Sequence, residues 1–253
     1  MRVALCFSGQ PRFINEVSSS ILNNVMDGNE VDVFAHFWFD DTLQNNPYKY
    51  GGDGGWINQR ISTSAIEDFK NIYKPKLLRI DTNKKFRNQH LFDTYKESVE
   101  RYKRGSIDNP LEPDFYTRDI NNIISYYYSL NQVGILKSEY EYANNFKYDC
   151  VIKMRTDTIV NNKILFDDIE PNSLYYSDNM HQPDGMINDW LNYGNSEVMS
   201  IFMSSFQFLG SLINDAKDQT GGAWCCELIH KKMLDRYGID PKPCNINLAL
   251  PRF

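Results

Sequence analysis

The stretch "MRVALCFSGQPRF" at residues 1–13 decides the fold that we expect. Residues 2–7 form an apolar run of the kind that buried strands show. The run stops at Gly9 and Pro11, which interrupt regular structure, and apolar residues then recur at helical spacing over residues 13–27. The opening therefore predicts a buried strand, a turn and a helix.

The following segments repeat this alternation of strand and helix. Strand patterns cover residues 30–38 and 76–81, and a helix is expected between them, from about Ser64 to Tyr73. The order strand–helix–strand–helix–strand favours a parallel sheet with right-handed crossovers. We therefore expect an α/β fold with a mostly parallel central sheet that is flanked by helices.

The rest of the chain continues with further predicted elements. These are a helix at about 118–145, strands at 148–154 and 173–178, and helices at about 196–214 and 224–237. Neither an internal repeat nor a linker divides the sequence. We therefore expect one domain over residues 1–253.

Composition and charge disfavour several classes of protein. The 253 residues are 42% hydrophobic and 24% charged, which is an ordinary globular composition. A net charge of −6 disfavours broad nucleic-acid binding, because such binding needs a basic surface to displace counterions. The sequence contains no run of roughly 18 apolar residues that would predict a membrane span. Five scattered cysteines form no zinc-binding pattern, and we expect them to be reduced in an intracellular, cytoplasmic protein.

Polar residues follow two apolar strands at the point where each should end. The stretch "DCVIKMRTDTIV" at residues 149–160 breaks off at Arg155-Thr156-Asp157, much as the opening run breaks off at Gly9 and Arg12. Ligands of open α/β sheets bind beyond the carboxyl ends of strands. Gly9 would let a ligand approach the backbone, and the guanidinium of Arg12 suits phosphate oxygens. The same residues also fit a tight turn that carries an exposed arginine.

Asp157 has two interpretations. A carboxylate at a strand end can hold a Mg²⁺-type ion that bridges a diphosphate, and a metal or an arginine there would stabilise the charge of a departing diphosphate. Alternatively, Asp157 forms an ion pair with Arg155 at a loop entrance. The spacing of the two residues by itself favours the ion pair.

Four motifs, in this order, resemble those of a GT-A-type glycosyltransferase family of large DNA viruses, bacteria and algae. They are "SGQPR" (8–12), "DVFAHFW" (32–38), "YDCVIKMRTD" (148–157) and "DWLNYGNSEVM" (189–199). The resemblance implies a Rossmann-like sheet, a nucleotide-sugar donor and a glycan or glycoconjugate acceptor. We expect a donor half at about residues 1–160 and an acceptor half at about 161–253, and a host-cytoplasmic location if the source is viral.

The resemblance also implies a donor site. Its residues would be Ser8, Gly9, Gln10, Arg12, Asp32, His36, Arg155 and Asp157. Asp157 would in addition bind a divalent cation, Mn²⁺ or Mg²⁺. Many GT-A enzymes carry Asp-x-Asp here, whereas this chain has Arg155 at the first position. We therefore expect weak metal affinity, with Arg155 contributing positive charge to diphosphate binding.

Three carboxylates are candidates for the catalytic base: Asp189, Glu227 and Asp184. An inverting transfer needs a base that removes the proton of the acceptor hydroxyl, whereas a retaining enzyme needs none in that position. Asp189 matches an aspartate of the family and precedes Trp190, whose ring could stack on a sugar. Alternatively, Asp189 caps the helix that follows, and Glu227 is an ordinary helix-face carboxylate.

Histidines and tyrosines give weaker signals. His36 has the strongest claim to a site because it ends a predicted strand within a matched motif. His90 and His230 are expected on solvated surfaces, and Tyr126 and its two neighbours are expected to pack in the core.

Two other functions stay open. One is a carbohydrate- or nucleotide-binding protein that has lost turnover. Arg155 favours this function, because it occupies the position of the first aspartate of the Asp-x-Asp motif. A sugar-nucleotidyltransferase is disfavoured because "SGQPRFINEV" lacks the Gly-rich basic loop of such enzymes.

Overall fold

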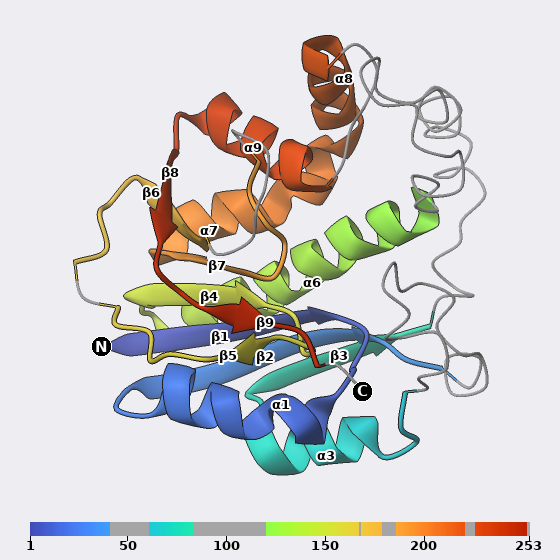
Figure 1. Ribbon diagram of the computed structural model, residues 1–253, viewed down its shortest axis with the longest axis vertical. Helices are drawn as coiled ribbons and strands as arrows, with labels where there is room; N and C mark the ends of the chain where they lie inside the picture. The colour runs from blue at the N-terminus through green and yellow to red at the C-terminus, as the bar shows by residue number, and fades with distance from the viewer. Residues whose placement is uncertain (41–60, 83–119, 167, 179–185, 221–225, 252–253) are drawn as a thin grey trace.

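The computed structural model describes residues 1–40, 61–82, 120–166, 168–178, 186–220 and 226–251. The fold is α/β, with a seven-stranded sheet between two layers of helices (Figure 1). The strand order is β3-β2-β1-β4-β7-β6-β8, and four of the six pairings are parallel. The predicted fold class, a mostly parallel sheet flanked by helices, is confirmed.

Three parallel strands form one side of the sheet: β1 (Arg2–Gly9), β2 (Glu30–Trp38) and β3 (Leu77–Asp81). The connecting helices are α1 (Ile14–Ile21), which continues into the π-helical turn Leu22–Met26, and α3 (Ala65–Tyr73). Both helices cover the same face, where their apolar side chains pack on Val3, Leu5 and Phe7 (Figure 1). The predicted alternation of strand and helix is confirmed over this part.

The long helix α6 (Ile120–Asn144) covers the opposite face and leads into β4 (Cys150–Met154), which pairs with β1 in parallel (Figure 1). Ala4 and Cys6 of β1 point to this second face, because side chains alternate along a strand. The chain thus leaves β1 for one face and enters β4 from the other. Such a switch of direction opens a crevice at the carboxyl ends of the two strands.

The second half of the chain completes the sheet with mixed pairings. Its strands are β6 (Ser173–Ser177), β7 (Leu191–Gly194) and β8 (Asp240–Cys244), and β7 runs antiparallel to both β4 and β6. Its helices are α7 (Ser196–Met203), the 3-10 turn η2 (Ser204–Phe208), α8 (Leu209–Thr220) and α9 (Cys226–Tyr237). A small separate sheet pairs β5 (Ile159–Val160) with β9 (Leu248–Ala249).

Some details differ from the sequence prediction. The helix expected at 196–214 is broken by η2, and the strands β7 and β8 were not predicted. β7 has four residues, which is too short for a period to be visible. β8 contains Pro241 and Pro243, and it lies at the edge of the sheet, where a missing backbone N–H is tolerated.

One segment within the described residues, Ser196–Ala216, is long and apolar enough to cross a membrane by length and composition. Half of its apolar window is buried. Phe202, Leu212 and Ile213 belong to the same hydrophobic core as α6 and α9. We therefore interpret this segment as core helices whose apolar composition serves packing.

Candidate functional site

Thr156 joins the two predicted turns at the carboxyl ends of β1 and β4. Its Oγ1 donates a hydrogen bond to the backbone oxygen of Gln10 at 2.8 Å and accepts one from the backbone nitrogen of Arg12 at 3.0 Å. Thr156 is almost fully buried. Residues that are about 145 positions apart in the sequence therefore meet at the carboxyl ends of the two strands.

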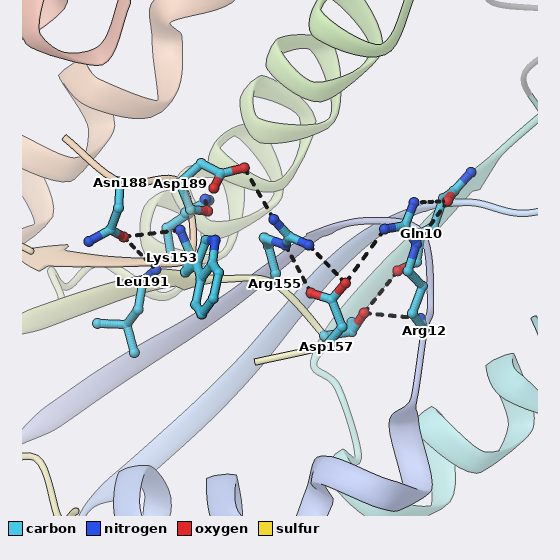
Figure 2. A network of polar contacts seen from close by, with 10 residues as sticks. Gln10, Arg12, Lys153, Arg155, Asp157, Asn188, Asp189 and Leu191 are labelled. Atoms are coloured by element: carbon cyan, nitrogen blue, oxygen red, sulfur yellow. Dashed lines mark hydrogen bonds and ion pairs between the residues drawn. The ribbon is translucent and has the colours of Figure 1, made fainter. Parts of the chain in front are cut away.

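Asp157 lies between two arginines (Figure 2). Its two oxygens accept hydrogen bonds from Nε and Nη2 of Arg155 at 2.8 and 2.9 Å, and Nη1 of Arg12 lies 3.5 Å from Oδ2. Burial raises the pKa of the Asp157 carboxyl, but Arg155 and Arg12 outweigh burial, so that this pKa lies below its usual value. The predicted ion pair is confirmed. Arg12 is about one quarter exposed, and its Nε donates to Oε1 of Gln10 at 3.0 Å.

Arg155 connects this turn to Asp189 (Figure 2). Its Nη1 lies 3.4 Å from Oδ2 of Asp189, and its guanidinium carbon lies 5.9 Å from the centre of the Trp190 ring. Its backbone nitrogen donates to the backbone oxygen of Trp190 at 3.0 Å. The Arg155 side chain is 21% exposed, and its guanidinium contacts two carboxylates.

The turn that carries Asp189 is fixed by neighbouring polar groups. The side-chain oxygen of Asn188 accepts a hydrogen bond from the backbone nitrogen of Trp190 at 3.1 Å, and Lys153 Nζ donates to the backbone oxygen of Asp189. The strand β7 follows this turn, and the residue that caps the next helix is Asn195. The interpretation of Asp189 as a helix cap is therefore wrong.

Lys153 is a site residue that the sequence analysis missed. It lies fully buried in β4, and its Nζ is 5.0 Å from the centre of the Tyr126 ring. Burial lowers the pKa of the Lys153 ammonium to about 8. The available signal was a lysine inside the apolar run "CVIKM", since a lysine is rarely buried without a polar partner.

Glu227, a second candidate for the catalytic base, lies in the same region as Tyr126. The Tyr126 hydroxyl lies 3.1 Å from Nε2 of His230. Burial raises the pKa of the Tyr126 hydroxyl well above its usual value, and the charges of Asp189 and Glu227 raise it further. Both carboxylates therefore lie near Tyr126. Glu227 is nearly buried in the first turn of α9, where its backbone oxygen accepts from the nitrogen of Ile187 at 3.1 Å.

The predicted solvated position of His230 is wrong, because the residue is fully buried. Burial and, to a smaller extent, the charge of Lys153 lower the pKa of its imidazole to about 3. His230 follows the apolar spacing of α9, which buries Ile229, Met233 and Leu234 as well. His90 lies outside the described residues.

His36 helps to position the turn that follows β1. Its Nδ1 lies 2.8 Å from Oγ of Ser129 and its Nε2 lies 3.1 Å from Oδ2 of Asp81. The same Ser129 oxygen accepts a hydrogen bond from the backbone nitrogen of Gly9 at 2.8 Å. His36 is fully buried, so its contacts position Gly9, and its ring does not reach the surface of the crevice.

Three further predicted residues have different outcomes. Asp32 lies opposite Ala4, about 13 Å along β2 from His36. There it accepts from the Tyr148 hydroxyl at 2.8 Å, so it is not brought together with the other candidates. Ser8 is buried at the end of β1, where its Oγ has no hydrogen-bond partner among the described residues. Asp184 lies outside the described residues.

The donor set around Asp157 does not fit a divalent cation as it stands. Both oxygens of Asp157 already accept hydrogen bonds from Arg155. An ion on this carboxylate would lie beside the like charges of Arg12 and Arg155. Within the described part of the chain, no group of three or more His, Cys, Asp or Glu side chains could hold a metal ion.

Comparisons with known proteins find similarity among solved structures. No family model matches the chain, and no curated protein matches it. Among solved structures, the chain is similar to mouse xyloside xylosyltransferase 1 in its apo form, with 10% sequence identity and a TM-score of 0.48. That similarity covers 96% of this chain and 85% of the mouse chain.

The low pKa of His230 predicts a loss of stability in acid. An unfolded histidine has a pKa near 6.5, so below that pH the unfolded chain binds a proton that the folded chain does not bind. From pH 7 to pH 5 this residue should reduce the free energy of unfolding by about 2 kcal/mol. In His230→Gln, the difference between urea unfolding at pH 7 and at pH 5 should shrink by about that amount. An unchanged difference would contradict the buried, neutral imidazole.

Proposed function

We propose that this chain is a glycosyltransferase that moves a sugar from a nucleotide-diphosphate-sugar donor to a hydroxyl of a glycan or glycoconjugate. One observation carries the proposal: three of the four motif segments meet at the switch point of the sheet. Thr156 connects the first and third segments, and Arg155 connects the third segment to Asp189 in the fourth. The crevice at a switch point is the usual ligand site of open α/β sheets.

The donor's diphosphate would bind at the turns after β1 and β4. A Cβ built on Gly9 meets no described atom within 4 Å, so a ligand could approach the backbone there. Arg12 and Arg155 are each between one fifth and one quarter exposed beside this turn. Guanidinium groups form strong, paired hydrogen bonds with phosphate oxygens. This arrangement supports a site for a diphosphate beside the two arginines.

The acceptor would bind on the side of Asp189 and Trp190. In an inverting transfer, the acceptor oxygen bonds to the anomeric carbon while the bond from that carbon to the diphosphate breaks. The hydroxyl proton would pass to the carboxylate of Asp189, and the negative charge on the leaving diphosphate would face Arg155. Glu227 is the second candidate base, since it also lies near Tyr126.

A binding protein without turnover is the second candidate function. The observation that favours it is the Arg155–Asp157 ion pair, which stands where many GT-A enzymes carry two aspartates. Such a protein would bind a nucleotide or a sugar at the same place and would release no free nucleotide from a nucleotide-sugar.

The test is a donor screen that measures binding and turnover separately. UDP-, GDP- and dTDP-sugars are incubated with the protein in EDTA, Mg²⁺ or Mn²⁺; binding is measured by titration calorimetry, and free nucleotide is quantified by chromatography. We expect nucleotide release from one donor class, and a loss of at least tenfold in Arg155→Ala. Arg236→Ala is the matched control, because Arg236 also forms an ion pair but lies on the surface of α9. Binding without release would support the binding protein, and neither binding nor release with any donor would overturn both functions.

Gly9→Ala tests the first turn. Gly9 has a φ of +114°, which L side chains rarely adopt, so alanine should cost about 1–3 kcal/mol of stability. The strain should also displace the turn and weaken nucleotide binding. Gly238→Ala is the control, because Gly238 has a φ of +64° and equally open surroundings but lies past the end of α9. It should lose stability and keep its nucleotide affinity, and equal affinities in the two variants would contradict a ligand site at Gly9.

A further inference from the structure

We propose that Arg155 supplies the charge that binds the donor diphosphate, so that the site works without a divalent cation. The inference rests on the proposed function, because it assigns a mode of binding to the same site. It follows from the contacts of Arg155 with the two carboxylates of the cluster and from the way its side chain is held.

The guanidinium of Arg155 lies between Asp157 and Asp189 and contacts both (Figure 2). Nε and Nη2 face the two oxygens of Asp157, and Nη1 faces Asp189. A metal ion held by both carboxylates would have to displace this group. The arginine therefore takes up the ligand atoms that a cation in this cluster would need.

The side chain of Arg155 is held in this position from several directions. Its backbone nitrogen donates a hydrogen bond to the backbone oxygen of Trp190, next to the β4–β7 pairing. Its guanidinium lies near the Trp190 ring. The bidentate contact with Asp157 fixes the plane of the guanidinium. The position of the guanidinium is therefore fixed before any ligand or ion binds.

The polar network in Figure 2 suits an anion better than a cation. It brings together three cationic side chains, Arg12, Lys153 and Arg155, with two carboxylates, Asp157 and Asp189. The carboxylates are turned toward the arginines, whose side chains remain partly exposed. In this view Asp157 is a positioning residue that orients two arginines, and it is not a metal ligand.

The experiment measures binding of UDP, GDP and dTDP by titration calorimetry in EDTA and in Mn²⁺. For the wild type we expect one nucleoside diphosphate to bind with affinities that agree within about twofold in the two buffers. Arg155→Ala should weaken that binding at least tenfold in both buffers. Arg155→Asp, which restores the Asp-x-Asp pattern, should bind weakly in EDTA and at least tenfold more tightly in Mn²⁺. Arg236→Ala should behave like the wild type.

Each outcome decides between the two proposals. Wild-type binding that appears in Mn²⁺ and is lost in EDTA would overturn metal independence and leave the proposed function standing. The absence of binding by all three nucleotides in both buffers would overturn the proposed function and the inference together. Circular dichroism and melting curves show whether the variants are folded. If Arg155→Asp does not fold, the comparison of EDTA with Mn²⁺ in the wild type decides by itself.

Discussion

Replacing Glu141 with alanine should lower the free energy of unfolding by about 3–5 kcal/mol, because it breaks a buried ion pair. Glu141 is 1% exposed on α6. Its carboxylate accepts hydrogen bonds from Lys137 Nζ at 3.0 Å, from the backbone nitrogen of Tyr148 at 3.0 Å and from the Ser196 hydroxyl at 2.5 Å. These contacts join α6 to the segment before β4 and to the start of α7.

The size of this loss of stability follows from the buried ammonium of Lys137, which remains when Glu141 is removed. Lys137 is fully buried, and without Glu141 its ammonium would keep only the hydroxyls of Ser196 and Ser200 within hydrogen-bond distance in this network. Burial already lowers the pKa of Lys137, and Glu141 opposes that shift. Loss of the carboxylate therefore leaves a buried cation without a counter-charge, which costs more than the pair itself contributes.

Urea unfolding at pH 7 measures this loss. Glu139→Ala is the control, because Glu139 is exposed on the same helix and should change the free energy of unfolding by no more than about 0.5 kcal/mol. A double variant, Lys137→Met with Glu141→Leu, removes both charges and should recover most of the stability. A loss below about 1 kcal/mol in Glu141→Ala would mean that the buried network is not an important source of stability.

The parallel half of the fold could be predicted because its signals are local. The strands at 2–9 and 30–38 are long apolar runs, and α1 and α3 show helical spacing between turn residues. β7 and β8 could not be predicted in this way. A four-residue strand shows no period, and the pairing of β8 depends on β6, which precedes it by more than 60 residues.

The site was predicted in part for the same reason. The turns after β1 and β4 could be predicted from residues where apolar runs end, and the Arg155–Asp157 pair could be predicted from a spacing of two. The contact of Thr156 with Gln10 and that of Arg155 with Asp189 join distant segments, and no local pattern encodes such contacts. The prediction for Asp32 was wrong in the opposite way. This motif residue was expected in the site, but it lies near the start of β2, away from the turns after β1 and β4.

Asp189→Asn should lower kcat at least about 100-fold, because asparagine keeps the shape of the side chain but cannot accept the proton of the acceptor hydroxyl. The carboxylate is well placed for this role: it is 18% exposed, it lies 3.4 Å from Arg155, and its backbone is fixed by Lys153. Donor affinity should change little, since asparagine can still accept a hydrogen bond from Arg155. A fall in kcat with an unchanged donor Kd would thus separate the chemical step from binding.

Two matched variants decide how this result is interpreted. Asp215→Asn removes a surface carboxylate that also pairs with an arginine, and it should leave kcat unchanged. Glu227→Gln tests the other acidic side chain near Tyr126. If Asp189→Asn keeps its kcat and Glu227→Gln loses it, the base is Glu227. If both variants keep their kcat, neither carboxylate is the base, and a retaining transfer, which needs no base in that position, becomes the better account of the Arg155 cluster.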